Sequence, residues 1–186
     1  MNQHQRRTEF ELSDNRRITF YPVVWNQETT IFQRNGSYRE MLLPGMFAAS
    51  LADPRNEVVA TVDHDPEKVL AKRTSGELLL TNDPHGVFAS LWLPETPLGD
   101  AVLSGVKEGT IWGCSCGWEG GENSTTDSGV VQWRSGRLFD VCVVMTGQPA
   151  YAGTEVNLRT HTRVDALLAR LRLVKFNISR LHTFNR

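Results

Sequence analysis

The sequence predicts a mainly β domain with flanking helices. Short apolar stretches recur along the chain between Gly, Pro, Asn and Asp residues, which is the pattern of many short strands joined by turns. Only two segments before residue 160 have helical spacing. The chain has 186 residues, enough for one substantial core, and shows no internal repeat or linker composition. We therefore predict a single domain over residues 1–186.

The apolar stretches locate the expected strands, which are 8–12, 18–21 leading into 23–25, 58–62, 78–80, 87–93, 113–118, 130–133 and 138–145. The composition Asp-Pro-His-Gly at 83–86 predicts a hairpin between two of them, with His85 as a solvated turn residue rather than a ligand. We expect 130–133 and 138–145 to pair with each other. The segment 119–129, rich in Gly, Ser and Thr, is expected to be a mobile loop that borders a cleft or forms a solvated hairpin tip.

Two helices and a distinct C-terminal segment complete the expected organisation. The segment 38–51 is expected to be helical after Pro44, and 97–107 to form a helix that ends at Gly109. From residue 160 onward, apolar residues recur at helical spacing among many arginines. We expect 160–186 to be a basic, partly helical segment that is part of the fold, a dimer contact or a docking tail.

Composition excludes several classes of function. The formal net charge of -1 argues against general nucleic-acid binding. No apolar run is long enough to span a bilayer, and residues 1–7 lack the apolar region of a secretory signal. The three cysteines cannot all pair, which favours a reduced, intracellular environment.

The hexapeptide Gly113-Cys-Ser-Cys-Gly-Trp118 is the most informative stretch of the chain. Side chains alternate along a strand, so Cys114 and Cys116 share one face with two tryptophans, and Ser115 shares the other with two glycines. Glycine in a strand indicates that something approaches the backbone closely. Ser115 is therefore either an exposed nucleophile or a serine that merely fits a Gly-rich strand.

Two other polar residues stand at the ends or middle of apolar strands. His64 follows the apolar run 58–62 and precedes Pro66, which predicts an anchored backbone with an exposed ring. Asp140 interrupts the apolar run 138–145, and a buried carboxylate is costly unless it is hydrogen-bonded or paired. Asp140 is thus either a structural carboxylate or the partner of His64 and Ser115.

The chain resembles the prohead (procapsid maturation) serine protease family of tailed bacteriophages, which is related in fold to the herpesvirus assemblin proteases. The matching motifs occur in order from the N-terminal strands to Asn157, and comprise Leu43-Pro-Gly-Met-Phe47, His64-Asp-Pro66 with Val69-Leu70, Gly76-Glu-Leu-Leu-Leu80, Leu93-Pro-Glu-Thr96, Gly113–Trp118, and Pro149-Ala-Tyr151 with Thr154. The resemblance implies a closed β-barrel flanked by helices. It also implies a triad of His64, Ser115 and Asp140.

The resemblance implies a biological role as well. Such proteases cleave scaffold segments from capsid precursors, and usually themselves, inside the procapsid in the host cytoplasm during head maturation. The expected partners are therefore the capsid precursor and the scaffold protein, with self-association of the protease and no cofactor, metal, nucleic acid or membrane. An inactive relative that serves as a capsid-assembly or scaffold-binding module is the alternative.

The sequence departs from the family pattern near the site. Asp63 stands where the family usually has Asn, and Asp140-Val-Cys142 stands where it commonly has Glu-Val-Ser. Asp140 reaches less far than Glu, so Asp63 and Asp65 are alternatives for the third member. A cysteine hydrolase that uses Cys114 or Cys116 is a further alternative, although both lie on the face opposite Ser115. The sequence assigns no oxyanion-hole residue and no cleavage preference.

Overall fold

The computed structural model describes residues 16–111, 113–146 and 156–158. Within these ranges the chain forms twelve strands, two α-helices and the short 3-10 turn Arg73–Ser75. The expected strand 8–12, the motif residues 149–151 and 154, and the basic segment 160–186 lie outside the described residues.

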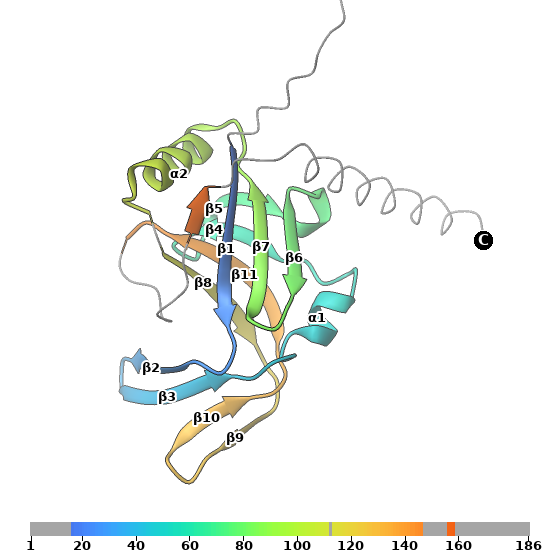
Figure 1. Cartoon of the computed structure of the whole chain (residues 1–186), viewed down its shortest axis with the longest axis vertical. Helices are drawn as coiled ribbons and strands as arrows, with labels where there is room; N and C mark the ends of the chain where they lie inside the picture. Colours follow the sequence, from blue (N-terminus) through green and yellow to red (C-terminus); the bar gives the residue numbers. More distant parts are fainter. Residues whose placement is uncertain (1–15, 112, 147–155, 159–186) are drawn as a thin grey trace, which may run out of the picture.

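The strands form three four-stranded sheets (Figure 1). Sheet A is entirely antiparallel and has the order β12 (Val156–Leu158), β1 (Arg17–Val24), β7 (Gly86–Trp92) and β6 (Leu78–Asn82). Sheet B has the order β2 (Glu28–Gln33), β3 (Gly36–Leu42), β10 (Val130–Trp133) and β9 (Asn123–Thr125). Sheet C has the order β5 (Asp65–Lys72), β4 (Val59–Val62), β11 (Arg137–Val144) and β8 (Gly113–Glu119).

The expectation of a mainly β architecture with flanking helices is confirmed, but a closed barrel is not. In the part of the chain that the structure describes, no hydrogen-bonded ladder joins the three sheets into one closed surface. Sheets A and C approach each other where the Cys114 thiol donates to the carbonyl of Tyr21, with an S···O distance of 3.3 Å. A closed barrel needs backbone hydrogen bonds between neighbouring strands, but here the hydrogen bond between β8 and β1 comes from a side chain. This contact lies next to the irregular register of β1 between Phe20 and Val23.

The two helices differ in how well the sequence predicted them. Helix α2 (Pro97–Glu108) is confirmed: the Thr96 hydroxyl caps its first turn, and Gly109 ends it in a left-handed conformation. Helix α1 (Ala48–Ala52) was expected directly after Pro44 but begins later, at Ala48. Gly45 has a φ of 84°, which no right-handed helix accommodates, so the helix begins only after it.

The pairing expected between 130–133 and 138–145 is wrong. Strand β10 pairs with β9 and, in parallel, with β3, whereas β11 pairs with β4 and β8, so the two strands belong to different sheets. Between them, the N–H of Gly136 bonds to the carbonyl of Met46, and a Cβ at Gly136 would lie 2.8 Å from the Met46 methyl carbon. This close packing bends the chain from one sheet into the next. The segment 119–129 contains β9, which pairs antiparallel with β10, so this segment forms an exposed hairpin tip, the second of its two expected arrangements.

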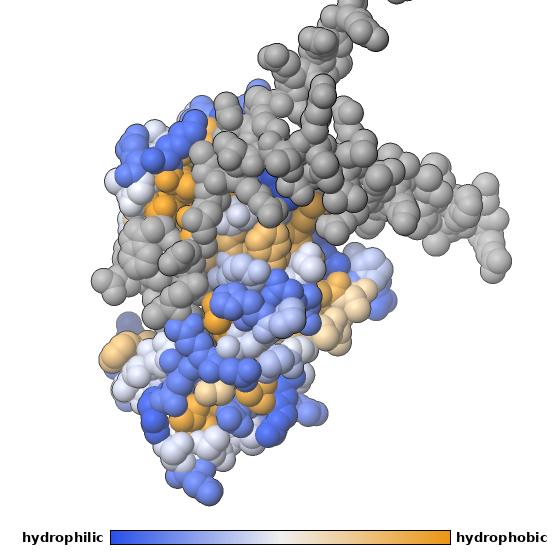
Figure 2. Space-filling model, viewed as in Figure 1, coloured by the Kyte–Doolittle hydropathy of each residue, from blue (hydrophilic) through white to orange (hydrophobic). Residues whose placement is uncertain are grey.

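The core lies mainly between sheets A and C. It includes Ile18 and Phe20 of β1, Leu91 of β7, and Val141 and Val143 of β11, all nearly inaccessible to solvent. On the face shown in Figure 2, hydrophilic residues cover much of the region of sheet B, and the apolar residues that are visible form separate patches. None of the described helices is both long and apolar enough to cross a membrane.

Candidate active site

His64 is presented by a tight turn between β4 and β5. Val62 and Asp65 are paired, and the two residues between them, Asp63 and His64, have φ values of 53° and 58°. Two consecutive left-handed residues define the type I′ hairpin turn, for which Asn and Asp are favoured at the first position. The turn places the His64 side chain outside the regular alternation of either strand.

The carboxylate of Asp63 fixes this turn to the end of β11. It accepts hydrogen bonds from the N–H of Met145 at 2.8 Å, and from the N–H and hydroxyl of Thr146 at 3.0 and 2.9 Å. Burial raises its pKa, but the hydrogen bonds from Thr146 and Met145 outweigh burial and leave the pKa below its ordinary value. The Asp65 carboxylate binds instead the N–H of Glu67 and the ammonium of Lys68. Neither aspartate is therefore hydrogen-bonded to the His64 ring.

A β-bulge directs Asp140 toward His64. Leu138 faces Trp118 and Asp140 faces Gly117, so Phe139 is an extra residue in β11. The bulge reverses the alternation: Leu138 belongs to the core, while Asp140 lies on the opposite face together with Cys142. We call this surface of sheet C the site face.

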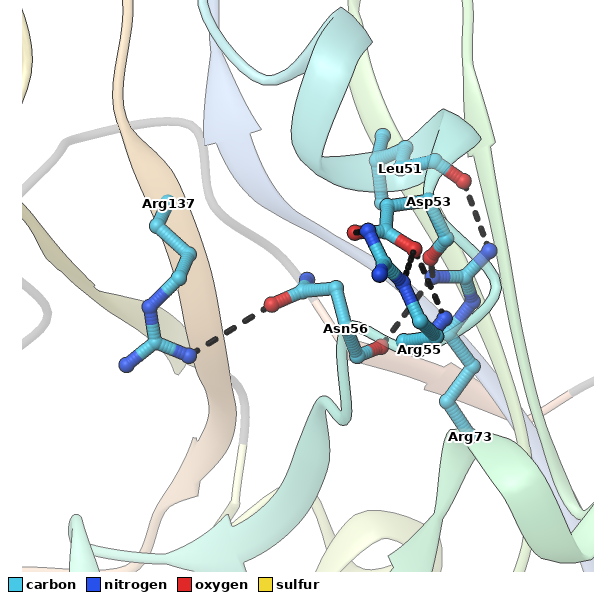
Figure 3. A network of polar contacts seen from close by, with 6 residues as sticks. All are labelled: Leu51, Asp53, Arg55, Asn56, Arg73 and Arg137. Atoms are coloured by element: carbon cyan, nitrogen blue, oxygen red, sulfur yellow. Dashed lines mark hydrogen bonds and ion pairs between the residues drawn. The ribbon is translucent and has the colours of Figure 1, made fainter.

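Helix α1 and the segment that follows it hold the bulge in place through hydrogen bonds to Leu138. The N–H of Leu138 donates to the Ser50 hydroxyl at 3.0 Å, and its carbonyl accepts from the Asn56 side-chain amide at 2.9 Å. Figure 3 shows how this segment is fixed in turn. Arg73 donates to the main-chain carbonyls of Leu51, Asp53 and Asn56, and Arg137 donates to the side-chain oxygen of Asn56. The network gives β11 a fixed starting point just before Asp140.

Asp140 and His64 form a short, directed ion pair. His64 Nδ1 lies 2.5 Å from Asp140 Oδ2, and the hydroxyl of Thr61 donates to the other oxygen, Oδ1, at 2.7 Å. The Asp140 side chain is 6% exposed, and that of His64 is 44% exposed. The hydrogen bond to Asp140, followed by one to Cys142, raises the pKa of His64 above its ordinary 6.5, against the opposing effect of burial. Because Nδ1 is bound to Asp140, Nε2 is the ring nitrogen that can exchange a proton with another group.

Ser115 lies on the same face as this pair. In the sheet register it is opposite Cys142, which is itself opposite Thr61, so the three side chains form a row across β8, β11 and β4. Ser115 is 9% exposed. Among the described residues no hydrogen bond joins its hydroxyl to His64, and the Cys142 thiol contacts the ring instead.

The surroundings of Gly117 leave little room for a side chain at this position. A Cβ at this position would lie 3.0 Å from Cε2 of Phe139 and 3.2 Å from Cβ of Asp140. The bulged residues of β11 thus occupy the space above the backbone of β8, as the glycine pattern predicted.

The other cysteines face away from the site. Cys114 is completely buried and belongs to the core. Cys116 is partly buried and packs against this core. Burial raises the pKa of the Cys116 thiol, which opposes formation of the nucleophilic thiolate. In the described ranges, no group of three or more His, Cys, Asp or Glu side chains is arranged to hold a metal ion.

A carboxylate, a histidine bound through Nδ1 and a serine share one face of sheet C, and these are the residue types of a serine-hydrolase triad. Comparison with known families identifies the group: the profile described as Caudovirus prohead serine protease matches residues 3–167, and the chain belongs to this family of serine proteases. The resemblance inferred from the ordered motifs is confirmed.

Comparison with solved structures finds, among others, the varicella-zoster virus protease. It is similar to this chain with a TM-score of 0.43 and 13% sequence identity, over 76% of this chain and 62% of that one. The match thus spans less than two thirds of the herpesvirus protein. No curated protein sequence matches the chain.

Sequence reasoning did not single out the residues that orient His64 and Asp140. Thr61 lies inside an apolar run, where its hydroxyl carries no distinctive pattern. Asp63 was considered as a substitute for Asp140 rather than as the anchor of the turn. Its neighbourhood did contain a signal, because an Asp or Asn before a strand reversal is typical of a left-handed turn position.

Proposed function

We propose that this chain is a serine endopeptidase that cleaves capsid-precursor and scaffold segments, and itself, inside the procapsid in the host cytoplasm. In this proposal Ser115 is the nucleophile, His64 the general base and Asp140 the residue that orients the imidazole. The observation that carries it is the 2.5 Å contact of His64 Nδ1 with buried Asp140, on the face that presents Ser115 in a serine protease family.

The chemistry follows from the roles of the two imidazole nitrogens. His64 Nε2 takes the proton of Ser115 as the hydroxyl oxygen attacks the peptide carbonyl, and then gives this proton to the leaving amine as the bond to nitrogen breaks. Water attacks the resulting acyl-serine with the same proton relay and restores the hydroxyl. Asp140 holds Nδ1–H and stabilises the imidazolium that forms at each step. The bond between serine and histidine is often long without substrate and shortens in the complex.

The raised pKa of His64 has a consequence for catalysis. Only the neutral imidazole accepts the serine proton, so kcat/KM is expected to rise with pH and to reach half its maximum above pH 6.5. A fall of kcat/KM at still higher pH would report the deprotonation of a different group.

The test is co-expression with the capsid precursor of the same virus, with intact mass as the readout. We expect defined cleavage products with the unmodified chain and none with Ser115→Ala. Ser104→Ala is the matched control, because Ser104 lies on the exposed side of α2 and its hydroxyl donates to Glu108. Labelling by a fluorophosphonate should follow the same pattern. Binding of the capsid or scaffold protein without cleavage or labelling would refute the proposal and favour an inactive assembly module.

A further inference from the structure

A partly exposed phenylalanine lies on the site face close to Ser115. Phe139, the bulged residue of β11, is 37% exposed, although large apolar side chains are mostly buried elsewhere in the described residues. Its ring lies above Gly117, since a Cβ on that glycine would meet ring carbons at 3.0 and 3.1 Å. Gly117 is two residues from Ser115 on β8, so ring and serine share one face.

The spacing matches that of a bound peptide. Residues two apart on a strand are about 7 Å from each other, which is also the repeat between alternate side chains of an extended peptide. A peptide whose carbonyl reaches Ser115 therefore has a side chain at the height of Phe139 within two residues of the scissile bond.

The same face continues beyond Phe139 into a hollow. The guanidinium carbon of Arg137 lies 5.7 Å from the centre of the Phe139 ring, and Arg137 is paired with Glu119. Both belong to the lining of a pocket of about 430 Å³, together with Ala49, Ser50, Asp53, Asn56, Gly120, Gly121 and Gly136. Glu119 is four residues from Ser115, about 13 Å along the strand. An extended peptide thus has a path from Ser115 over Phe139 to this pocket.

The pocket also leaves a donor for a peptide. The Ser50 hydroxyl accepts hydrogen bonds from the Asn56 side-chain amide and from the N–H of Leu138, and its own proton has no acceptor among the described residues. A hydroxyl with both acceptor positions occupied is available to donate to a carbonyl. The charged lining residues Asp53 and Glu119 are compensated by Arg55 and Arg137.

We propose that Phe139 is the wall of a substrate subsite, and that it selects an extended peptide with an apolar side chain within two residues of the scissile bond. This inference rests on the proposed function, because it takes Ser115 as the attacking group. Contact with the exposed ring removes apolar surface of both partners from water. Discrimination by one apolar side chain in such a subsite is about ten- to hundredfold.

The experiment uses the full chain and a peptide library derived from a digested proteome, with cleaved bonds identified by mass spectrometry. We expect the unmodified chain to favour Leu, Ile, Met or Phe at one position within two residues of the cleaved bond. Phe139→Ala should lower that preference at least tenfold and leave the other positions unchanged. Phe32→Ala is the matched control, since Phe32 is 82% exposed on the edge strand β2 of another sheet.

A second variant separates selection from misfolding. Phe139→Glu should shift the preference at the same position toward Lys and Arg, a gain that an unfolded protein cannot produce. An unchanged preference in both Phe139 variants, or no apolar preference in the unmodified chain, would overturn the role of Phe139 alone. Absence of any cleavage by the unmodified chain would instead overturn the proposed function, and the subsite with it.

Discussion

Replacing Asp140 by Asn tests the central pair directly. The substitution keeps the shape of the side chain and the acceptor for the Thr61 hydroxyl, which lies 2.7 Å from Oδ1. It replaces the acceptor 2.5 Å from His64 Nδ1 by an amide donor, which favours the tautomer with the proton on Nε2. We expect a loss of turnover on the order of 10⁴-fold, as for the same change in other triads.

The effect on stability has a defined pH dependence. The pKa of His64 is raised from 6.5 to about 10 in the folded protein. The pair therefore contributes stability that is fully present below pH 6.5 and is lost as the pH rises through about 10. His64 is 44% exposed and solvent screens the pair, so we take about 2 kcal/mol, typical of one charged hydrogen bond, rather than the full shift.

The assay combines thermal unfolding with peptide hydrolysis. At pH 6 the Asn variant should melt about 4–8 °C below the unmodified chain, and this difference should shrink by pH 10.5. Its kcat/KM should be low at every pH. Turnover equal to that of the unmodified chain would refute the role of Asp140 and leave a dyad, and a melting difference independent of pH would refute the ionic character of the pair.

Two further predictions concern the other members of the site. His64→Ala should lower kcat as much as Ser115→Ala, and the double variant should be no worse than either single variant, because the effects of residues that act as one unit are strongly non-additive. If the loss in the double variant were instead the product of the two single losses, the two residues would act independently. Thr61→Val should lower kcat about tenfold and shift the midpoint of the pH–rate profile, since it leaves a buried oxygen of Asp140 without its donor. Thr61→Ser should restore both quantities, and a profile unmoved in Thr61→Val would assign Thr61 to packing alone.

Part of the regular elements of the fold could be predicted from apolar pattern and turn composition, whereas β2, β3, β5, β9 and β12 were not predicted as strands. Strands β4, β6, β7 and β8 and helix α2 all lie where the pattern placed them. Strand β5 escaped prediction because it is the edge of sheet C and most of its first residues are exposed. An edge strand with solvated side chains on both faces shows no alternation to read.

The site could be predicted as a set of residues but not as a geometry. Strict alternation places Leu138, Asp140 and Cys142 on one face, which would put a carboxylate among core residues. The bulge at Phe139 resolves this conflict, and it depends on contacts from Ser50 and Asn56, more than 80 residues away in sequence. Pairings over such distances in sequence leave no local pattern, so the sequence could not indicate the bulge.

The parallel pairing of β4 with β11 also determines at what stage of protein synthesis His64 and Asp140 can come into contact. His64 and Asp140 are separated by 76 residues, and the contact requires a long crossover to close before the two strands meet. During translation, β4, β5 and the His64 turn emerge well before β11 is available. A nascent chain that has already exposed Ser115 still lacks the carboxylate that orients the histidine. The topology thus imposes a delay on the ribosome-bound protein, and the contact between His64 and Asp140 forms only after β11 has been synthesised.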